Sequence, residues 1–263
     1  MLEISRQGYY KKRRKKAEEL LEEEIIIDMV KEIRRRLPRI GGRKLYYLLK
    51  EDLTKLPSGP GRDKFFGILR KYGLLIKPMK QFVRTTNSNH RFRIHSNLLI
   101  GLVVDAPNEV FVSDITYIRL EGDFSFLFLV TDVYSRKIVG YYLSMSLAAR
   151  GAVIAMKKAI RGVTDTDYLI HHSDRGFQYC CEEYISLLTS HNIKISMGET
   201  GNPYDNAIAE RVNGILKNEF YLNSTFRSFN DAQKAVREAI NNYNTLRPHM
   251  SIGYLTPEKK YAA

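Results

Sequence analysis

The feature that most restricts the fold of this chain is the order of its apolar runs after residue 109. Three runs rich in β-branched and aromatic residues follow one another with short turns between them, at residues 110–120, 124–132 and 137–144. Helical and strand-like segments then alternate: a helix at 147–161, a strand at 168–171, a helix at 182–191, a strand at 193–196, and helices at 204–221 and 229–244. This order predicts an α/β domain, a mixed five-stranded sheet with helices packed against it.

The first hundred residues differ from the rest in charge and in pattern. They hold 25 Lys and Arg against 11 Asp and Glu, whereas residues 101–263 hold 17 against 18. The apolar spacing predicts helices at 10–37, 43–53 and 62–72, followed by a basic stretch without periodicity. We therefore expect three parts: a basic helical region at 1–75, a linker at 76–108 and the α/β domain at 109–263.

A basic half joined to a neutral half predicts an acidic partner, and DNA or RNA fits best. A solvated basic surface or a membrane-surface patch is the alternative. Short helices with a Gly/Pro turn and many arginines are typical of a helix-turn-helix module, although a plain helical bundle fits the same pattern. The candidate DNA contacts in this half are Arg43, Lys44, Arg62, Lys64, Arg91 and Arg93.

Several classes of protein do not fit the sequence. No apolar run reaches transmembrane length, and the N-terminus lacks the apolar core of a signal peptide, so we expect a cytoplasmic protein. The only cysteines, Cys180 and Cys181, are adjacent, which excludes an ordinary disulfide framework. A metal site shared with His171 and His172 matches no zinc spacing, so burial as small residues is the better interpretation.

Candidate functional residues concentrate between residues 171 and 220. Asp174 follows a short apolar run, so we expect it at a strand end. Spacings of four, three and four place four polar residues on one face of the predicted helix that follows: Asn206, Glu210, Asn213 and Lys217. One acid, two amides and a lysine, separate from the apolar stripe, are unusual for a merely solvated face. Asp114, on the first predicted strand, offers a third acid upstream.

Six local strings add a resemblance to a known family. They are Ser113-Asp-Ile-Thr-Tyr117, residues 132–140 (DVYSRKIVG), His172-Ser-Asp-Arg-Gly176, Ser196-Met197, residues 201–206 (GNPYDN) and residues 243–249 (YNTLRPH). In this order, and with 35 residues between Asp174 and Glu210, they resemble insertion-sequence transposases with a retroviral-integrase-type catalytic core. The chain resembles the downstream, catalytic part of a branch often expressed from two overlapping reading frames.

The resemblance implies a ribonuclease H-like integrase core and a metal-dependent polynucleotidyl transferase that cuts element ends and transfers strands. Asp114, Asp174 and Glu210 would be its catalytic, metal-binding acids. Two Mg²⁺ ions roughly 3.5–4 Å apart, replaceable by Mn²⁺, would activate the attacking hydroxyl and stabilise the leaving oxygen. Asp114 would bridge the two ions, and the other two acids would each complete one.

Further roles are expected around this triad. Lys217 would reach a phosphate, with an ordinary surface lysine as the alternative. Asn206 would either orient DNA or cap the helix of Glu210. Asp132 is expected to have a structural role at a strand end, and His172 and His249 are expected to make supporting hydrogen bonds or phosphate contacts without binding metal.

The resemblance also implies partners and a location. The partners are double-stranded DNA, as terminal inverted repeats and target, a second copy of the chain when assembled on DNA, and an upstream-frame polypeptide; no membrane is involved. The location is the bacterial cytoplasm, associated with the nucleoid. Two alternatives remain, a ribonuclease H-like nuclease that cuts without joining and a catalytically silent DNA-binding regulator of transposition. The basic helical half counts against the first, and the intact acid triad counts against the second.

Overall fold

The computed structural model describes residues 5–77, 94–198 and 206–263. Residues 1–78 and residues 79–263 form two compact units. Each unit buries its own set of apolar side chains.

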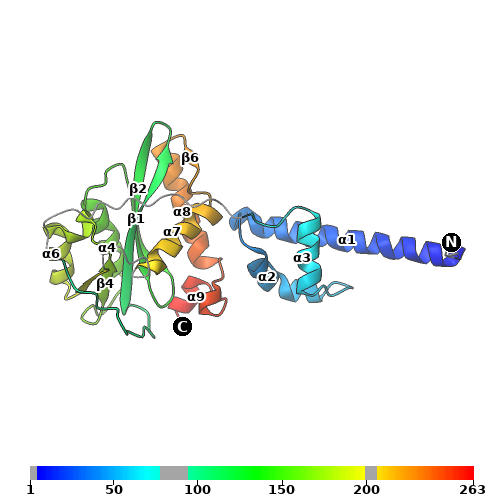
Figure 1. Cartoon of the computed structure of the whole chain (residues 1–263), viewed down its shortest axis with the longest axis horizontal. Helices are drawn as coiled ribbons and strands as arrows, with labels where there is room; N and C mark the ends of the chain where they lie inside the picture. The colour runs from blue at the N-terminus through cyan, green and yellow to red at the C-terminus, as the bar shows by residue number, and fades with distance from the viewer. Residues whose placement is uncertain (1–4, 78–93, 199–205) are drawn as a thin grey trace. The chain divides into compact units, whose positions relative to one another are not determined.

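The first unit consists of the three helices α1 (Arg6–Arg36), α2 (Gly42–Thr54) and α3 (Arg62–Lys71) (Figure 1). The C-terminal half of α1 carries the apolar residues that pack inward, among them Ile26 and Val30, both fully buried. They meet the leucines of α2 and Phe65 of α3, which recur at helical spacing. The helix pair α2–α3, with the Gly/Pro turn between the two helices, is the one that the spacing predicts.

Polar contacts fix α1 against the segment that leads into α3. Glu22 is 7% exposed, and its carboxylate accepts a hydrogen bond of 2.8 Å from the backbone N–H of Ser58. Near the end of α1, Arg34 donates to the carbonyl of Leu74 at 2.8 Å. Buried carboxylates and guanidinium groups need such partners, so these contacts close the unit at both ends of the packed half of α1.

The second unit is built on one sheet. Its strands are β1 (Val110–Leu120), β2 (Asp123–Asp132), β3 (Ile138–Ser144), β4 (Ile170–Ser173), β5 (Lys194–Met197) and the two-residue β6 (Thr225–Phe226). The order is β3-β2-β1-β4-β5, with β6 beside β1. β1, β2 and β3 run antiparallel, whereas β4, β5 and β6 join in parallel. The sheet is therefore mixed, as predicted, with β6 added at one end of β1.

Helices cover both faces of this sheet (Figure 1). α4 (Arg150–Ile160), α5 (Phe177–Cys180) and α6 (Glu182–Ser190) form one apolar cluster with Phe111 and Phe128. α7 (Ala207–Glu219) and α8 (Phe229–Thr245) form another with Ile118 and Leu120. Because side chains alternate along a strand, the even-numbered residues of β1 face α7 and α8. Asp114 lies among them.

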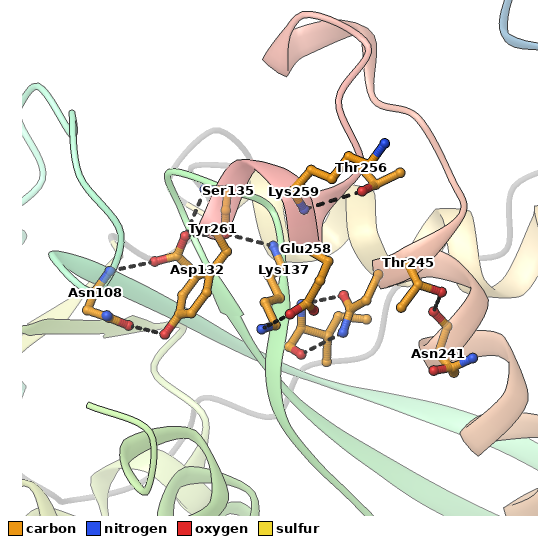
Figure 2. Close-up of polar contacts among 12 residues, drawn as sticks. Asn108, Asp132, Ser135, Lys137, Asn241, Thr245, Thr256, Glu258, Lys259 and Tyr261 are labelled. Atoms are coloured by element: carbon orange, nitrogen blue, oxygen red, sulfur yellow. Dashed lines mark hydrogen bonds and ion pairs between the residues drawn. The ribbon is translucent and has the colours of Figure 1, made fainter. Parts of the chain in front are cut away.

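The C-terminus is held to the β2–β3 turn by a group of polar contacts (Figure 2). A 3₁₀ turn, η1 (Met250–Ile252), leads into α9 (Pro257–Tyr261). Lys137 pairs with Glu258 at 2.9 Å, and the hydroxyl of Tyr261 donates to Asn108 at 2.6 Å. These contacts tie the last helix to the residues just before β1 and to the turn between β2 and β3.

The predicted architecture is confirmed, a mixed sheet covered by helices with an all-helical region before it in the sequence. β1 has the predicted bounds, and the other predicted elements differ by a few residues at their ends; residues 204–205 of the predicted helix at 204–221 lie outside the described residues. Four elements were not predicted: α5, β6, η1 and α9. Each has five residues or fewer, which is too short for a hydrophobic period to show.

Candidate active site

Asp114 lies in the middle of β1 on the face that α7 covers. Its Oδ1 accepts a hydrogen bond from the following backbone N–H, that of Ile115, at 2.9 Å. Its Oδ2 accepts one from Nδ2 of Asn213 on α7, at 2.7 Å. Both carboxylate oxygens are therefore oriented, one by the strand and one by the helix.

The electrostatic environment of Asp114 is set by its burial and by the other two acids. Burial raises the pKa of Asp114 most, the charge of Asp174 raises it further and that of Glu210 adds to this, to about 7. The hydrogen bonds from Asn213 and Ile115 act in the opposite direction, because they stabilise the charged form. Three acids from distant parts of the sequence thus share one site, and they repel one another there.

Asp174 follows β4 directly, as predicted for a strand end. β4 pairs with β1 in parallel, through Phe111 with His171 and Val112 with His172. Two positions further along this register, Asp174 comes level with Asp114. The backbone N–H of Gly176, just before α5, donates to Oδ1 of Asp174 at 3.0 Å. The loop after the strand therefore holds this carboxylate.

The helix α7 supplies the remaining polar groups. Glu210 lies in its first turn, where the negative charge of a carboxylate suits the helix dipole. Lys217 lies two turns further on. Its pKa is lowered, because burial lowers it more than attraction to Asp114 raises it. The predicted common face of this helix is confirmed, because Glu210, Asn213 and Lys217 all act on Asp114.

Asn206 stands at the predicted N-cap position of α7, where its backbone carbonyl accepts a hydrogen bond from the N–H of Glu210 at 3.1 Å. It is 4% exposed, its side chain makes no capping hydrogen bond, and its Nδ2 donates to the backbone carbonyl of Ser113 at 3.0 Å. The residue therefore begins the helix without the predicted side-chain cap, and its expected role in orienting DNA stays a prediction. Its amide instead ties the start of α7 to the residue before Asp114.

A buried hydrogen-bond network that sequence reasoning missed holds Ser113, the residue before Asp114, from the other side of the sheet. The hydroxyl of Ser113 is hydrogen-bonded to Nε2 of His171 at 2.8 Å, and the same nitrogen contacts the hydroxyl of Tyr184 on α6 at 2.9 Å. Burial lowers the pKa of His171 to about 3, and the neighbouring His172 contributes, so the ring is neutral. The odd position of Ser113 on β1 is the one signal that could have indicated this direction.

The structural role predicted for Asp132 and a supporting hydrogen bond of His172 are confirmed, whereas the contact shown for His249 is with an aromatic ring. His172 is hydrogen-bonded through Nδ1 to Ser196 on β5 at 2.8 Å, and the ring of His249 packs edge-on against Tyr243. Asp132 is fully buried and accepts hydrogen bonds from the backbone N–H groups of Ser135 and Asn108 (Figure 2). It shapes the turn after β2.

The cysteines are buried and free, which agrees with the interpretation as small core residues. Sγ of Cys180 lies 3.8 Å from Sδ of Met197, and burial raises the thiol pKa to about 11. Across the described ranges, no set of three or more His, Cys, Asp or Glu side chains is already arranged to hold a metal ion. The three acids therefore interact electrostatically, but their side chains are not arranged as a preformed metal site.

The DNA contacts predicted in the basic half of the sequence lie in different environments. Arg43 and Arg62 are exposed at the starts of α2 and α3, and Arg62 pairs with Asp63 at 3.1 Å. Lys44 is half-buried. Lys64 donates to the hydroxyl of Ser58 at 2.8 Å and lies 3.7 Å from Glu22, so it also helps to hold α1. The last two, Arg91 and Arg93, lie outside the described residues.

Comparisons with known proteins identify the family of this chain. Two integrase core domain families match the chain, one over residues 104–203 and one over residues 191–257. The chain is 35% identical over 258 residues to the insertion element IS600 uncharacterized 31 kDa protein of Shigella sonnei, covering 97% of this chain and 93% of that protein. It is 33% identical over 193 residues to transposase InsF for insertion sequence IS3A of Escherichia coli K12, covering 73% of this chain and 67% of that protein.

A solved structure shows the same fold. The simian T-cell lymphotropic virus intasome in complex with PP2A regulatory subunit B56 gamma contains a chain that is 20% identical, with a TM-score of 0.51, covering 85% of this chain and 75% of that one. The chain belongs to the insertion-sequence transposases with an integrase-type catalytic core, and it is a DNA transposase. Among the residues described, no helix combines the length and the apolar character that crossing a bilayer requires.

Proposed function

We propose that Asp114, Asp174 and Glu210 are the catalytic acids with which this transposase cuts the ends of its element and joins them to target DNA. The observation that supports this best is the electrostatic state of Asp114. Its pKa is raised to about 7 by burial and by the charges of exactly these two other acids, which come from two separate elements. Repulsion among three clustered carboxylates destabilises the folded state unless another interaction offsets it. A bound cation usually supplies that interaction.

The donor set of this site suits Mg²⁺, with Mn²⁺ as substitute. All three side chains offer carboxylate oxygens, the ligands that Mg²⁺ prefers, and a cation would relieve the repulsion among them. We infer that Asp114, Asp174 and Glu210 would together hold the ions, with Asp114 as the carboxylate that both of the others act on. When bound, the ions would activate the attacking water or 3′-hydroxyl and stabilise the leaving 3′-oxygen.

Other residues of the chain prepare the site. Asn213 holds one oxygen of Asp114, and the N–H of Gly176 holds one oxygen of Asp174. Each carboxylate is therefore fixed in orientation before a metal ion binds. Lys217 is half-buried beside Asp114. Its ammonium group is placed to bind a phosphate oxygen of the DNA once the charge of Asp114 is shared with metal.

The DNA partners would be the terminal inverted repeats of the element and its target. We propose that residues 1–75 supply most of the affinity for DNA, that residues 76–108 connect the two parts, and that residues 109–263 carry the chemistry. The chain would act as a homo-oligomer assembled on DNA, together with a polypeptide from the upstream reading frame. None of the comparisons favours a silent regulator or a nuclease that cuts without joining.

The test is conservative replacement of each acid in the full chain. Asp114→Asn, Asp174→Asn and Glu210→Gln should each abolish cleavage and strand transfer on an end-sequence duplex, and each should weaken Mn²⁺ binding measured by calorimetry. The fold should survive, because removing one charge relieves repulsion. Glu183→Gln, an exposed acid on α6, is the matched control and should leave both activities unchanged. Full activity of any triad variant would remove that residue from the mechanism.

A metal series separates this mechanism from metal-free chemistry. Mg²⁺ and Mn²⁺ should support cleavage, whereas Ca²⁺ should support little, because its looser coordination does not hold the in-line geometry. Robust cleavage in excess EDTA would contradict the proposed role of the acids.

A further inference from the structure

The N-terminal half of α1 is exposed and has no packing partner among the described residues of its unit. Residues 9–21 are all exposed, and the first buried residue of the helix is Glu22. Figure 1 shows this half extending beyond α2 and α3, which pack against the other half. We call residues 6–21 the α1 arm.

The charge of the α1 arm opposes its own folding. It carries seven Lys and Arg against two Glu, and six of the cations are consecutive, Lys11–Lys16. In a helix, cations three and four positions apart are neighbours and repel one another. The first turn of α1 contains no acid to complement the positive end of the helix dipole.

The arm has few internal partners for these charges. Arg14 pairs with Glu18 at 2.9 Å, with both side chains largely exposed. For the other five cations of the run, no acidic partner lies within ion-pair distance in the described part of the chain. The packed half of α1 differs, since Lys31 pairs with Asp28 and Arg35 with Glu32. The unbalanced charge is thus confined to the half that packs against nothing.

The direction of the cations indicates the shape of the partner. Six consecutive residues pass through more than one and a half turns at about 3.6 residues per turn, so the run surrounds the helix. Lys11 and Lys15 share one side, and Arg13 and Lys16 lie roughly opposite. A flat membrane or protein surface would be contacted by one side and would favour an apolar stripe there. A groove of duplex DNA, with phosphates along both walls, would be contacted by both sides.

We propose that the α1 arm lies in a groove of duplex DNA and binds the phosphates of both walls, independently of base sequence. This rests on the proposed function only in that the chain acts on DNA. The site is separate from the helix pair α2–α3, whose sequence is typical of a helix-turn-helix module. It would add affinity for any duplex, target as well as end.

The experiment compares three double variants of the full chain on a scrambled duplex at several salt concentrations. Lys11→Gln/Lys15→Gln removes one side, and Arg13→Gln/Lys16→Gln removes the other. Lys31→Gln/Arg35→Gln removes the same charge from the packed half of α1 and is the control. Glutamine is a good helix former, so circular dichroism should show the helix retained.

Each arm variant should reduce the slope of log affinity against log salt by about 1.8, at about 0.9 per lost phosphate contact. Between about 50 and about 200 mM salt, the wild type should then lose about 12-fold more affinity than either arm variant. The control should keep the wild-type slope. The same reduction on an end-sequence duplex would show that the contact is independent of sequence.

Three results would overturn the proposal. If only one arm variant changed the slope, the arm would lie on a surface and not in a groove. If the control changed the slope equally, net charge alone would explain the effect. If the arm variants lost binding to phosphatidylserine vesicles and kept their affinity for DNA, the partner would be a lipid surface. Asp174→Asn should keep the wild-type slope, so failure of the catalytic proposal would leave this measurement intact.

Discussion

The hydrogen bond from Asn213 to Asp114 makes the sharpest prediction about the site. Nδ2 of Asn213 lies 2.7 Å from Oδ2 of Asp114, a short distance for a bond to a carboxylate, and the asparagine is 7% exposed. Asn213→Leu removes the donor and keeps the approximate volume. Bonds to charged groups contribute about 1.5–3 kcal/mol, and each 1.4 kcal/mol is tenfold, so we expect Mn²⁺ binding to weaken by about 10–150-fold.

The same substitution should change stability little, because two terms oppose each other. Oδ1 of Asn213 is buried without a hydrogen-bond partner in the described part of the chain, and burying such an atom costs about 1–3 kcal/mol. Leucine removes this penalty together with the favourable bond from Nδ2. A thermal melt near that of the wild type would therefore accompany the loss of metal binding, which separates positioning from folding.

The assay is cleavage of an end-sequence duplex as a function of Mn²⁺ concentration, with calorimetry on the same protein. Asn213→Leu should raise the Mn²⁺ concentration for half-maximal rate more than it lowers the maximal rate, because a large excess of metal can orient Asp114 by itself. Asn213→Asp should be worse, since it adds a fourth negative charge. Asn218→Leu, an exposed asparagine on the same helix, is the control. Unchanged metal dependence in Asn213→Leu would refute the reasoning.

Three further outcomes are expected. Arg247→Ala should lower the free energy of unfolding by about 3 kcal/mol in a denaturant titration, because it breaks a two-point ion pair with Glu219, at 2.7 and 2.8 Å, in which the arginine is 3% exposed; a loss under 1 kcal/mol would contradict this. The unfolded chain binds a proton at His171 below about pH 6.5 and the folded chain only below about 3. The free energy of unfolding should therefore decrease as the pH is lowered from about 6.5 to about 3, and it should decrease less steeply in His171→Gln. A fragment of residues 105–263 should fold yet bind DNA weakly and without preference for element ends, as a titration against end and scrambled duplexes would show; equal selectivity to the full chain would disprove the division of labour.

The sequence was informative where periodicity is long. The eleven residues of β1 alternate in burial toward its end, and its bounds could be predicted without error. The common face of α7 could also be predicted, because spacings of four, three and four allow only one arrangement on a helix. Which group that face would meet could not be predicted. The amide of Asn206 contacts a carbonyl that is 93 residues away in the sequence.

Polar contacts between distant segments were the least predictable part of both units. Nothing local in the sequence indicates that Ser113 would bond to His171, or that Lys64 would share Ser58 with Glu22. Such partners are chosen when elements pack, since a buried polar group is satisfied by whatever the fold brings near. A candidate DNA contact such as Lys64 is therefore easily overestimated from charge alone.

The acids of the candidate site repel one another, so uncharged groups must set their spacing. Ser113 connects the three elements: its own strand β1 carries Asp114, its hydroxyl bonds to β4, which ends just before Asp174, and its carbonyl bonds to the residue that begins the helix of Glu210. Neutral hydrogen bonds keep their strength whether or not a cation is present. Charged contacts among the acids would reverse in sign with metal binding. The elements thus stay in register in both states, and only the carboxylates need to adjust when metal and DNA bind.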